Sequence, residues 1–138
     1  MPAKPFLDTN IIVYAFSSND PRSERAYALM QEGGIISVQV LNELVNVWRR
    51  KQRRGWAEIE DGLTVVKRLL DPALALTVEI HDAAVGITRN HGYSIYDSLI
   101  VAAALRAGCT TLYSEDFQHR QTIEQLTIRD PFADSTPP

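Results

Sequence analysis

The chain alternates short apolar segments with longer segments whose apolar residues recur at helical spacing. Three apolar segments, at 3–7, 35–37 and 110–113, have the length of short strands. Short apolar strands that are separated by helices favour a parallel sheet covered by helices on both faces. Further strands are expected at 73–78 and 126–129. The sequence therefore predicts an α/β fold in which helices dominate.

Capping and helix-breaking residues delimit the predicted helices. Asp20-Pro21 has the form of an N-cap followed by proline at the first helical position, and Gly33 ends the helix that it opens. Ser94 is expected to cap a strongly apolar helix at 96–107, which Gly108 ends. The expected helices lie at 10–15, 21–31, 39–53, 56–70, 79–90 and 96–107.

The composition fits one globular domain. The chain has 138 residues, a net charge of −3 and 45% hydrophobic residues, which excludes wholesale disorder. Its one cysteine, Cys109, excludes an internal disulfide framework and is expected to be buried. No apolar run approaches the ~18 residues of a membrane span and no signal peptide is evident, so a cytoplasmic protein is expected. We expect the domain to cover residues 1–131 and residues 132–138 to form a flexible C-terminal tail.

Four acidic residues are expected at one edge of the predicted sheet. Asp8 directly follows the first strand, and Asp116 follows the strand at 110–113. The carboxyl ends of parallel strands meet at one edge, where open sheets of this kind bind ligands. Glu43 lies about one turn into the helix after the second strand, near its apolar face. Asp97 opens the apolar helix that follows Ser94, and its position in the first turn indicates the same edge.

Each acid also has a purely structural interpretation. Asp8 can cap the first helix, and Asp97 can complete a capping box. Asp116 can stabilise a turn, and Glu43 can pair with an arginine. Together, however, four acids that are far apart in the sequence map to one edge of one sheet. Carboxylates brought close together repel unless protons or a cation compensate their charge. Because no histidine or cysteine lies among them, Mg²⁺ or Mn²⁺ is expected rather than zinc.

The motifs around these acids resemble, in the same order, those of PIN-domain ribonucleases. The motifs are Leu7-Asp8-Thr9-Asn10, Leu41-Asn42-Glu43-Leu44, Tyr96-Asp97-Ser98-Leu99 and Leu112-Tyr113-Ser114-Glu115-Asp116-Phe117. Within that family the chain most resembles the VapC-type toxins of toxin–antitoxin pairs. The resemblance implies a three-layer α/β/α sandwich and a metal-dependent endoribonuclease that cuts single-stranded or looped RNA. It also implies a homodimer and a cognate antitoxin that silences the enzyme.

The resemblance assigns roles to particular residues. The family pattern has a polar residue two positions after the first acid, here Asn10, and Ser or Thr two positions before the last acid, here Ser114. The expected ligands of one or two metal ions are Asp8, Glu43, Asp97 and Asp116. A metal-activated water would hydrolyse the phosphodiester bond, with Asn10 and Ser114 orienting the carboxylates or the water.

A basic run follows Glu43 on the same predicted helix. Its cations are Arg49, Arg50, Lys51, Arg53 and Arg54. They either complement the dipole of a solvated helix end or bind the RNA backbone one or two turns beyond the metal site. Trp48 and Trp56 bracket this run, and packing in the core or a dimer is favoured over base stacking for both.

Two other protein classes, a signalling module and a phosphatase, place acids at the same edge of a parallel sheet. A phosphoryl-accepting receiver domain needs a lysine late in the chain, whereas the lysines here are Lys4, Lys51 and Lys67. A haloacid-dehalogenase-type phosphatase needs a second aspartate two residues after the first, where this chain has Asn10. The alternative that stays open is a non-catalytic dimer of the PIN-like fold that binds a metal ion or a partner in its acidic pocket.

Overall fold

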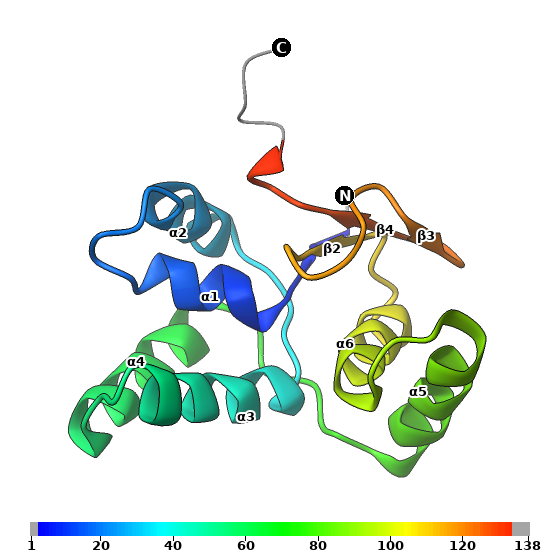
Figure 1. The fold of residues 1–138 in the computed structure, drawn as a ribbon, viewed down its shortest axis with the longest axis horizontal. Coiled ribbons are helices and arrows are strands. Elements are labelled where there is room, and N and C mark those ends of the chain that lie inside the picture. The colour runs from blue at the N-terminus through cyan, green and yellow to red at the C-terminus, as the bar shows by residue number, and fades with distance from the viewer. Residues whose placement is uncertain (1–2, 134–138) are drawn as a thin grey trace.

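The computed structural model describes residues 3–133, which form a small sheet with helices on both sides (Figure 1). The strands are β1 (Phe6–Leu7), β2 (Thr111–Tyr113), β3 (Thr122–Ile123) and β4 (Leu126–Arg129). The helices are α1 (Thr9–Ala15), α2 (Ser23–Glu32), α3 (Val38–Asn46), α4 (Trp56–Leu69), α5 (Val78–His91) and α6 (Ile95–Arg106), and a π-helical segment, η1 (Val47–Lys51), continues α3.

The sheet has the strand order β1-β2-β4-β3, and only its last strand is antiparallel. Leu112 of β2 pairs with Phe6 and with Ile128, and all three side chains are fully buried. The parallel part of the sheet was predicted, but the β3–β4 hairpin was not. Its turn places Glu124 at a φ of +52°. Because this left-handed residue is not the usual Gly, Asn or Asp, no turn signal is visible in the sequence.

The strands expected at 35–37 and 73–78 are reduced to isolated parallel bridges. One bridge joins the first segment to β1, and the other joins Ser37 to Leu74. A helix begins soon after each bridge, at Val38 and at Val78. The bridges nevertheless extend the parallel sheet beyond β1.

The chain order determines which helices cover which face of the sheet. From β1 the chain moves outward to the two bridging segments and then returns to β2, on the other side of β1. With right-handed crossovers, this reversal places α1–α4 on one face and α5 and α6 on the other, the arrangement in Figure 1. The architecture is the predicted three-layer α/β/α sandwich. The crevice at the carboxyl ends of β1 and β2 is the switch point where such sheets bind ligands.

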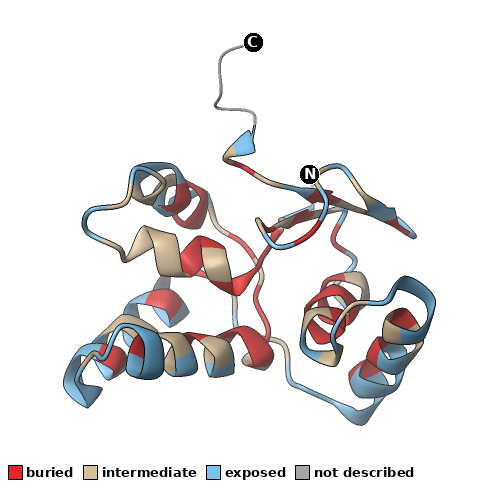
Figure 2. Ribbon diagram, viewed as in Figure 1, coloured by how far each residue is buried: buried red, intermediate tan, exposed pale blue. Residues whose placement is uncertain are grey.

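Buried residues concentrate where the helices face the sheet (Figure 2). The α6 helix is packed between the sheet and α5, and its segment 98–104 is buried throughout. This helix has the expected apolar character on every side. Trp48 and Cys109 are also buried, as predicted, whereas Trp56 is 54% exposed and does not belong to the core.

Two predicted helix boundaries were wrong. The α2 helix begins at Ser23 rather than at Pro21, because Asp20 accepts the backbone N–H of Arg22 at 2.9 Å and forms a turn before the helix. The helix expected at 39–53 changes to π-helical geometry after Asn46.

The chain ends beside α1 in the part that the structure describes. Phe132 packs edge-to-face against Tyr14, with ring centroids 5.5 Å apart. The first residue of the predicted C-terminal tail therefore lies against the domain, and residues 134–138 lie outside the described residues. Within residues 3–133, no helix has the length and apolarity needed to cross a membrane.

Candidate functional site

Asp8 lies at the carboxyl end of β1, in the crevice beside β2. Its carboxylate accepts hydrogen bonds from the backbone N–H of Thr9 at 2.7 Å and from the hydroxyl of Ser114 at 2.7 Å. The first bond caps α1, so the structural interpretation of Asp8 is also correct. Burial raises the pKa of Asp8 to about 7, the two hydrogen bonds oppose this increase, and the charges of Glu43 and Asp116 add to it. A buried carboxyl group that titrates near neutrality is typical of functional sites.

Glu43 is held beside Asp8 by two buried side chains that the sequence analysis did not identify. The Thr9 hydroxyl donates to its Oε1 at 2.6 Å, and the Gln39 amide donates to its Oε2 at 3.1 Å. The partners of Glu43 are therefore neutral side chains and not the arginine of the alternative interpretation. Thr9 follows Asp8 directly, so its bond to Glu43 ties the beginning of α1 to α3.

Asp97 and Asp116 complete the acidic edge from α6 and from the loop after β2. Burial raises the pKa of Asp97, and the charges of Asp116 and Glu43 raise it further. The same two charges act on Asp8. The four acids therefore lie within electrostatic range of one another, although within residues 3–133 no three of them converge into a metal cluster. The structure therefore brings all four predicted acids to one edge of the sheet.

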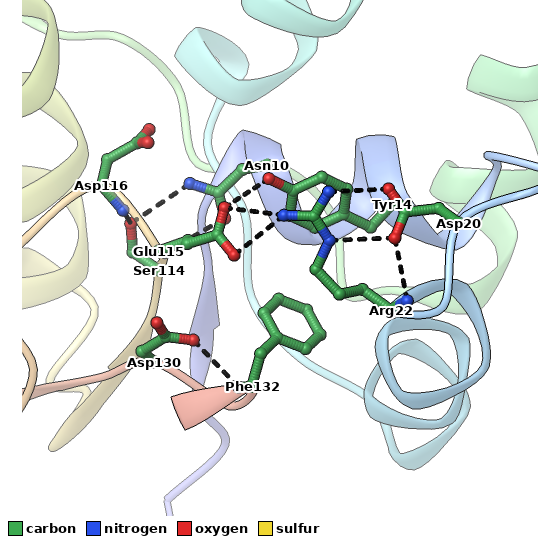
Figure 3. Close-up of polar contacts among 9 residues, drawn as sticks. All are labelled: Asn10, Tyr14, Asp20, Arg22, Ser114, Glu115, Asp116, Asp130 and Phe132. Atoms are coloured by element: carbon green, nitrogen blue, oxygen red, sulfur yellow. Dashed lines mark hydrogen bonds and ion pairs between the residues drawn. The ribbon is translucent and has the colours of Figure 1, made fainter. Parts of the chain in front are cut away.

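Ser114 links the loop after β2 to Asp8 and to α1. Its buried hydroxyl donates to Asp8 and accepts the backbone N–H of Asp116 at 3.1 Å. The Asn10 amide approaches the same hydroxyl at 3.4 Å, and its carbonyl oxygen accepts the Glu115 N–H at 3.3 Å (Figure 3). The two predicted polar residues thus hold the loop that carries Asp116 against α1.

A second cluster, which the sequence analysis missed, holds this loop from the side of α2. The Arg22 guanidinium lies 3.7 Å from the centroid of the Tyr14 ring and donates to both carboxylate oxygens of Glu115 at 3.1 Å. The Tyr14 hydroxyl donates to Glu115 as well, and Arg22 also pairs with Asp20 at 2.8 Å. Glu115 points towards Arg22, whereas Asp116 points the opposite way (Figure 3). Arg22 thus compensates the charge of Glu115 and keeps this fifth carboxylate apart from the other four.

The donor set at this edge fits a hard divalent cation. Every candidate ligand carries oxygen, and burial raises the pKa of one of the carboxyl groups, Asp8, with a smaller increase from the charges of Glu43 and Asp116. Within residues 3–133, no three His, Cys, Asp or Glu side chains converge closely enough to form a complete three-ligand metal site. Mg²⁺ binds through as few as one or two carboxylates and keeps several waters, so it suits an open arrangement of this kind. The residues that would hold it, directly or through water, are Asp8, Glu43, Asp97 and Asp116.

The basic run begins on η1 and reaches the acidic edge at one residue. Lys51 lines a hollow of about 430 Å³ that it shares with Asn10, Glu43 and Asp116. Four of the five cations of the run have exposed side chains: Arg49, Arg50, Lys51 and Arg53. All four cations lie on the surface, but only Lys51 shares a hollow with the acids.

Arg54, the last cation of the run, faces inward instead. Its guanidinium donates to the carbonyl oxygen of Phe16 at 2.9 Å and to the Gln52 side chain at 2.9 Å. It also lies 5.6 Å from the centroid of the Trp48 ring. Arg54 therefore closes the loop after η1, and it is less available to a ligand than the other four cations.

Ser114→Ala is expected to weaken Mn²⁺ binding and any metal-dependent activity about 10- to 100-fold, the usual cost of removing a group that orients a ligand. The variant removes the hydroxyl that holds Asp8 and the backbone of Asp116. Calorimetric titration with Mn²⁺ measures the effect. Ser37→Ala is the matched control, because the buried Ser37 hydroxyl has no hydrogen-bond partner within residues 3–133. Equal Mn²⁺ affinities for the two variants would contradict the role of Ser114.

The fold and the site together define a class: an α/β sandwich with an acidic crevice at the switch point of a parallel sheet. The sequence model of the PIN domain family matches residues 6–124. The chain therefore belongs to the PIN domain family, which confirms the family resemblance of the sequence motifs.

Three solved structures share this fold at low sequence identity. One is VapC20 of Mycobacterium tuberculosis, a sarcin–ricin loop cleaving toxin, with a TM-score of 0.67 and 20% identity over 82% of this chain and 90% of that one. A toxin–antitoxin complex from Klebsiella pneumoniae matches with a TM-score of 0.67 and 16% sequence identity, over 92% of this chain and 97% of that one. VapBC2 of Rickettsia felis, bound to a DNA fragment from its promoter, matches with a TM-score of 0.65 and 20% sequence identity, over 90% of this chain and 96% of that one. No curated protein matches the sequence.

Proposed function

We propose that this protein is a metal-dependent endoribonuclease of the VapC type, the toxin of a toxin–antitoxin pair. The observation that carries the proposal is the buried Asp8 carboxylate at the sheet's switch point, which accepts the Ser114 hydroxyl at 2.7 Å in the loop that carries Asp116. Membership of the PIN domain family supports it, as does the similarity of the fold to toxins such as VapC20.

In the proposed reaction, some residues of the site hold the acidic side chains in position and others contact the substrate. Ser114 and the Thr9 N–H fix the Asp8 carboxylate, and the Thr9 hydroxyl fixes Glu43. A bound Mg²⁺ or Mn²⁺ ion supplies a Lewis acid that activates water and offsets charge on the phosphodiester. Lys51 lines the same hollow as Asp116 and is placed to bind a phosphate oxygen of the substrate. Cleavage in this way leaves 5′-phosphate and 3′-hydroxyl ends.

The partners that we propose are a cognate antitoxin and a second copy of the chain. The solved structures from Klebsiella pneumoniae and Rickettsia felis contain toxin and antitoxin together, which supports an antitoxin partner for this fold. We propose that the protein acts in the cytoplasm, where the RNA substrate is found, and that the antitoxin silences it there.

A cleavage assay on the full chain tests the proposed function. End-labelled single-stranded and stem-loop RNAs are incubated with Mg²⁺, with Mn²⁺ and with excess EDTA. Cleavage is expected only with a divalent ion, and the products should carry 5′-phosphate ends. Cleavage that is unchanged by EDTA would contradict the metal requirement, and Mn²⁺ binding without cleavage of any RNA would favour the non-catalytic alternative.

A growth experiment tests the biological role separately. Expression of this chain alone is expected to arrest growth, and co-expression of the neighbouring reading frame should relieve the arrest. Growth that is unaffected at a verified level of soluble protein would contradict the role as a toxin.

A further inference from the structure

Three hollows adjoin one another along the exposed side of α3, next to the acidic edge. One, of about 370 Å³, lies beside Glu43 and Tyr96. The second is the 430 Å³ hollow between Glu43 and Asp116 described above, and the third, of about 320 Å³, lies beside Arg50 and Trp56. Asn46 lines all three. The hollows beside Tyr96 and Trp56 also share Asn42, so a recessed track runs along α3 from Tyr96 to Trp56 and adjoins the acidic edge at Glu43.

Each end of this α3 track carries an exposed aromatic ring. Tyr96 is 62% exposed and Trp56 is 54% exposed, so neither ring is needed to fill the core. Arg49 places its guanidinium 4.9 Å from the centroid of the Trp56 indole and so helps to orient the ring. Figure 1 shows α3 lying between α4, which begins at Trp56, and α6, whose first turn carries Tyr96.

The middle of the α3 track presents amides and cations. Asn42 and Asn46 are four residues apart, and Arg49 and Arg50 continue the same side of the helix into η1. All four side chains are exposed. The protein as a whole has a net charge of −3, so this concentration of cations is a local feature. It complements a polyanion that lies along α3.

The combination of exposed rings, amides and cations fits unpaired RNA. Aromatic rings bind bases that are free to leave a stack, amides hydrogen-bond the edges of bases, and arginines contact the backbone. A duplex offers its phosphates to such a surface but not the faces of its bases. We propose that Tyr96, next to the acidic edge, and Trp56, at the other end of the α3 track, are stacking sites for two nucleobases of the same strand, with Asn42 and Asn46 facing base edges between them. This inference rests on the proposed function and assigns the substrate contacts of that site.

Binding of RNA without cleavage tests the inference. The Asp8→Asn protein, kept in a chelator, is titrated with a fluorescent single-stranded RNA of mixed sequence. Trp56→Ala and Tyr96→Ala are each expected to weaken binding between about fivefold and a hundredfold, the usual contribution of one stacked base. Trp56→Phe and Tyr96→Phe should retain most of the affinity, because phenylalanine also stacks. Binding of the same sequence as a duplex should be insensitive to all four changes.

Tyr27→Ala is the matched control. Tyr27 is also an exposed aromatic residue, at 39%, but it lies on α2, away from the α3 track. Its removal should leave RNA affinity unchanged. Thermal melts of each variant confirm that the fold is intact, which is expected because all three rings are at the surface.

Tryptophan fluorescence gives a direct signature of stacking. The chain has two tryptophans, of which Trp48 is 1% exposed and Trp56 is 54% exposed. Saturation with single-stranded RNA is expected to quench the emission of Trp56, and Trp56→Phe should abolish the quenching while the emission of Trp48 remains. Quenching that survives in Trp56→Phe would count against the stacking site.

The outcomes separate this inference from the proposed function. If the wild-type protein cleaves RNA while both alanine variants bind single strands normally, the stacking sites are wrong and the nuclease stands. If the protein neither binds nor cleaves RNA, the stacking sites and the proposed nuclease function are both wrong. If Trp56→Ala leaves RNA affinity intact but shifts a dimer to monomer in light scattering, the exposed indole contacts a second copy of the chain, which also overturns the inference.

Discussion

Asp8→Asn is expected to abolish metal-dependent RNA cleavage, lowering kcat/KM by at least about a hundredfold. Loss of a residue that only orients a metal ligand costs about 10- to 100-fold, so loss of a buried ligand charge should cost at least the upper value. Asparagine keeps the size of the side chain and can still accept the N–H of Thr9. The expected defect is therefore chemical rather than structural, and initial cleavage rates in Mg²⁺ and Mn²⁺ measure it.

Asp61→Asn is a control with the same change of charge. Asp61 lies on α4 and is exposed, so its replacement should leave cleavage unchanged. Retention of full activity in Asp8→Asn would show that the buried carboxyl group is not part of the chemistry. A loss of activity in both variants would show that the defect is not specific to the buried carboxyl group, because removal of a negative charge by itself should favour the binding of RNA.

The second large effect concerns the stability of the metal-free protein. The pKa of Asp8 is about 7 in the folded chain, against an ordinary value of 3.8, so the folded state holds a proton that the unfolded state releases between these values. The unfolding free energy of the wild type should therefore fall as the pH rises from about 4 to about 7, by at most about 4 kcal/mol. Asp97 contributes in the same direction, because its pKa is also raised.

Asp8→Asn removes this titration, so the stability of the variant relative to the wild type should increase with pH. In a chelator at about pH 8, the variant is expected to unfold at a higher denaturant concentration than the wild type, whereas at about pH 4 the two should be similar. Added Mn²⁺ should stabilise the wild type and not the variant, since only the wild type gains a bound ion. If the difference in unfolding free energy between the variant and the wild type were the same at both pH values, Asp8 would not have a raised pKa.

Much of the site could be predicted because its residues lie at element boundaries that local sequence defines. Asp8 follows an apolar strand and caps α1, and Asp97 lies in the first turn of a helix that Ser94 caps. In a parallel sheet, such boundaries fall at one edge whatever the details of packing. Placement of these acids therefore needed only the order of strands and helices.

The partners of the acids were less visible, because they depend on contacts between distant segments. The pairing of Arg22 with Glu115 joins residues 93 positions apart, and no spacing in the sequence indicates that they meet. The hydrogen bond from Thr9 to Glu43 likewise depends on how α1 packs against α3. The β3–β4 hairpin was missed because its turn places Glu124 in a left-handed conformation that its residue type does not signal.

The sequence by itself determined the alternation of strands and helices, the membership of the PIN domain family and the common edge of the four acids. These features follow from periodicity, capping and strand order, which are encoded over a few neighbouring residues. Only the tertiary structure decided that Asp8 is buried beside Ser114 and that Arg54 faces inward. It also decided that Trp56 and Tyr96 remain exposed at the two ends of the α3 track. Burial and charge compensation arise from side chains that only the completed fold brings together, so they cannot be read from local sequence.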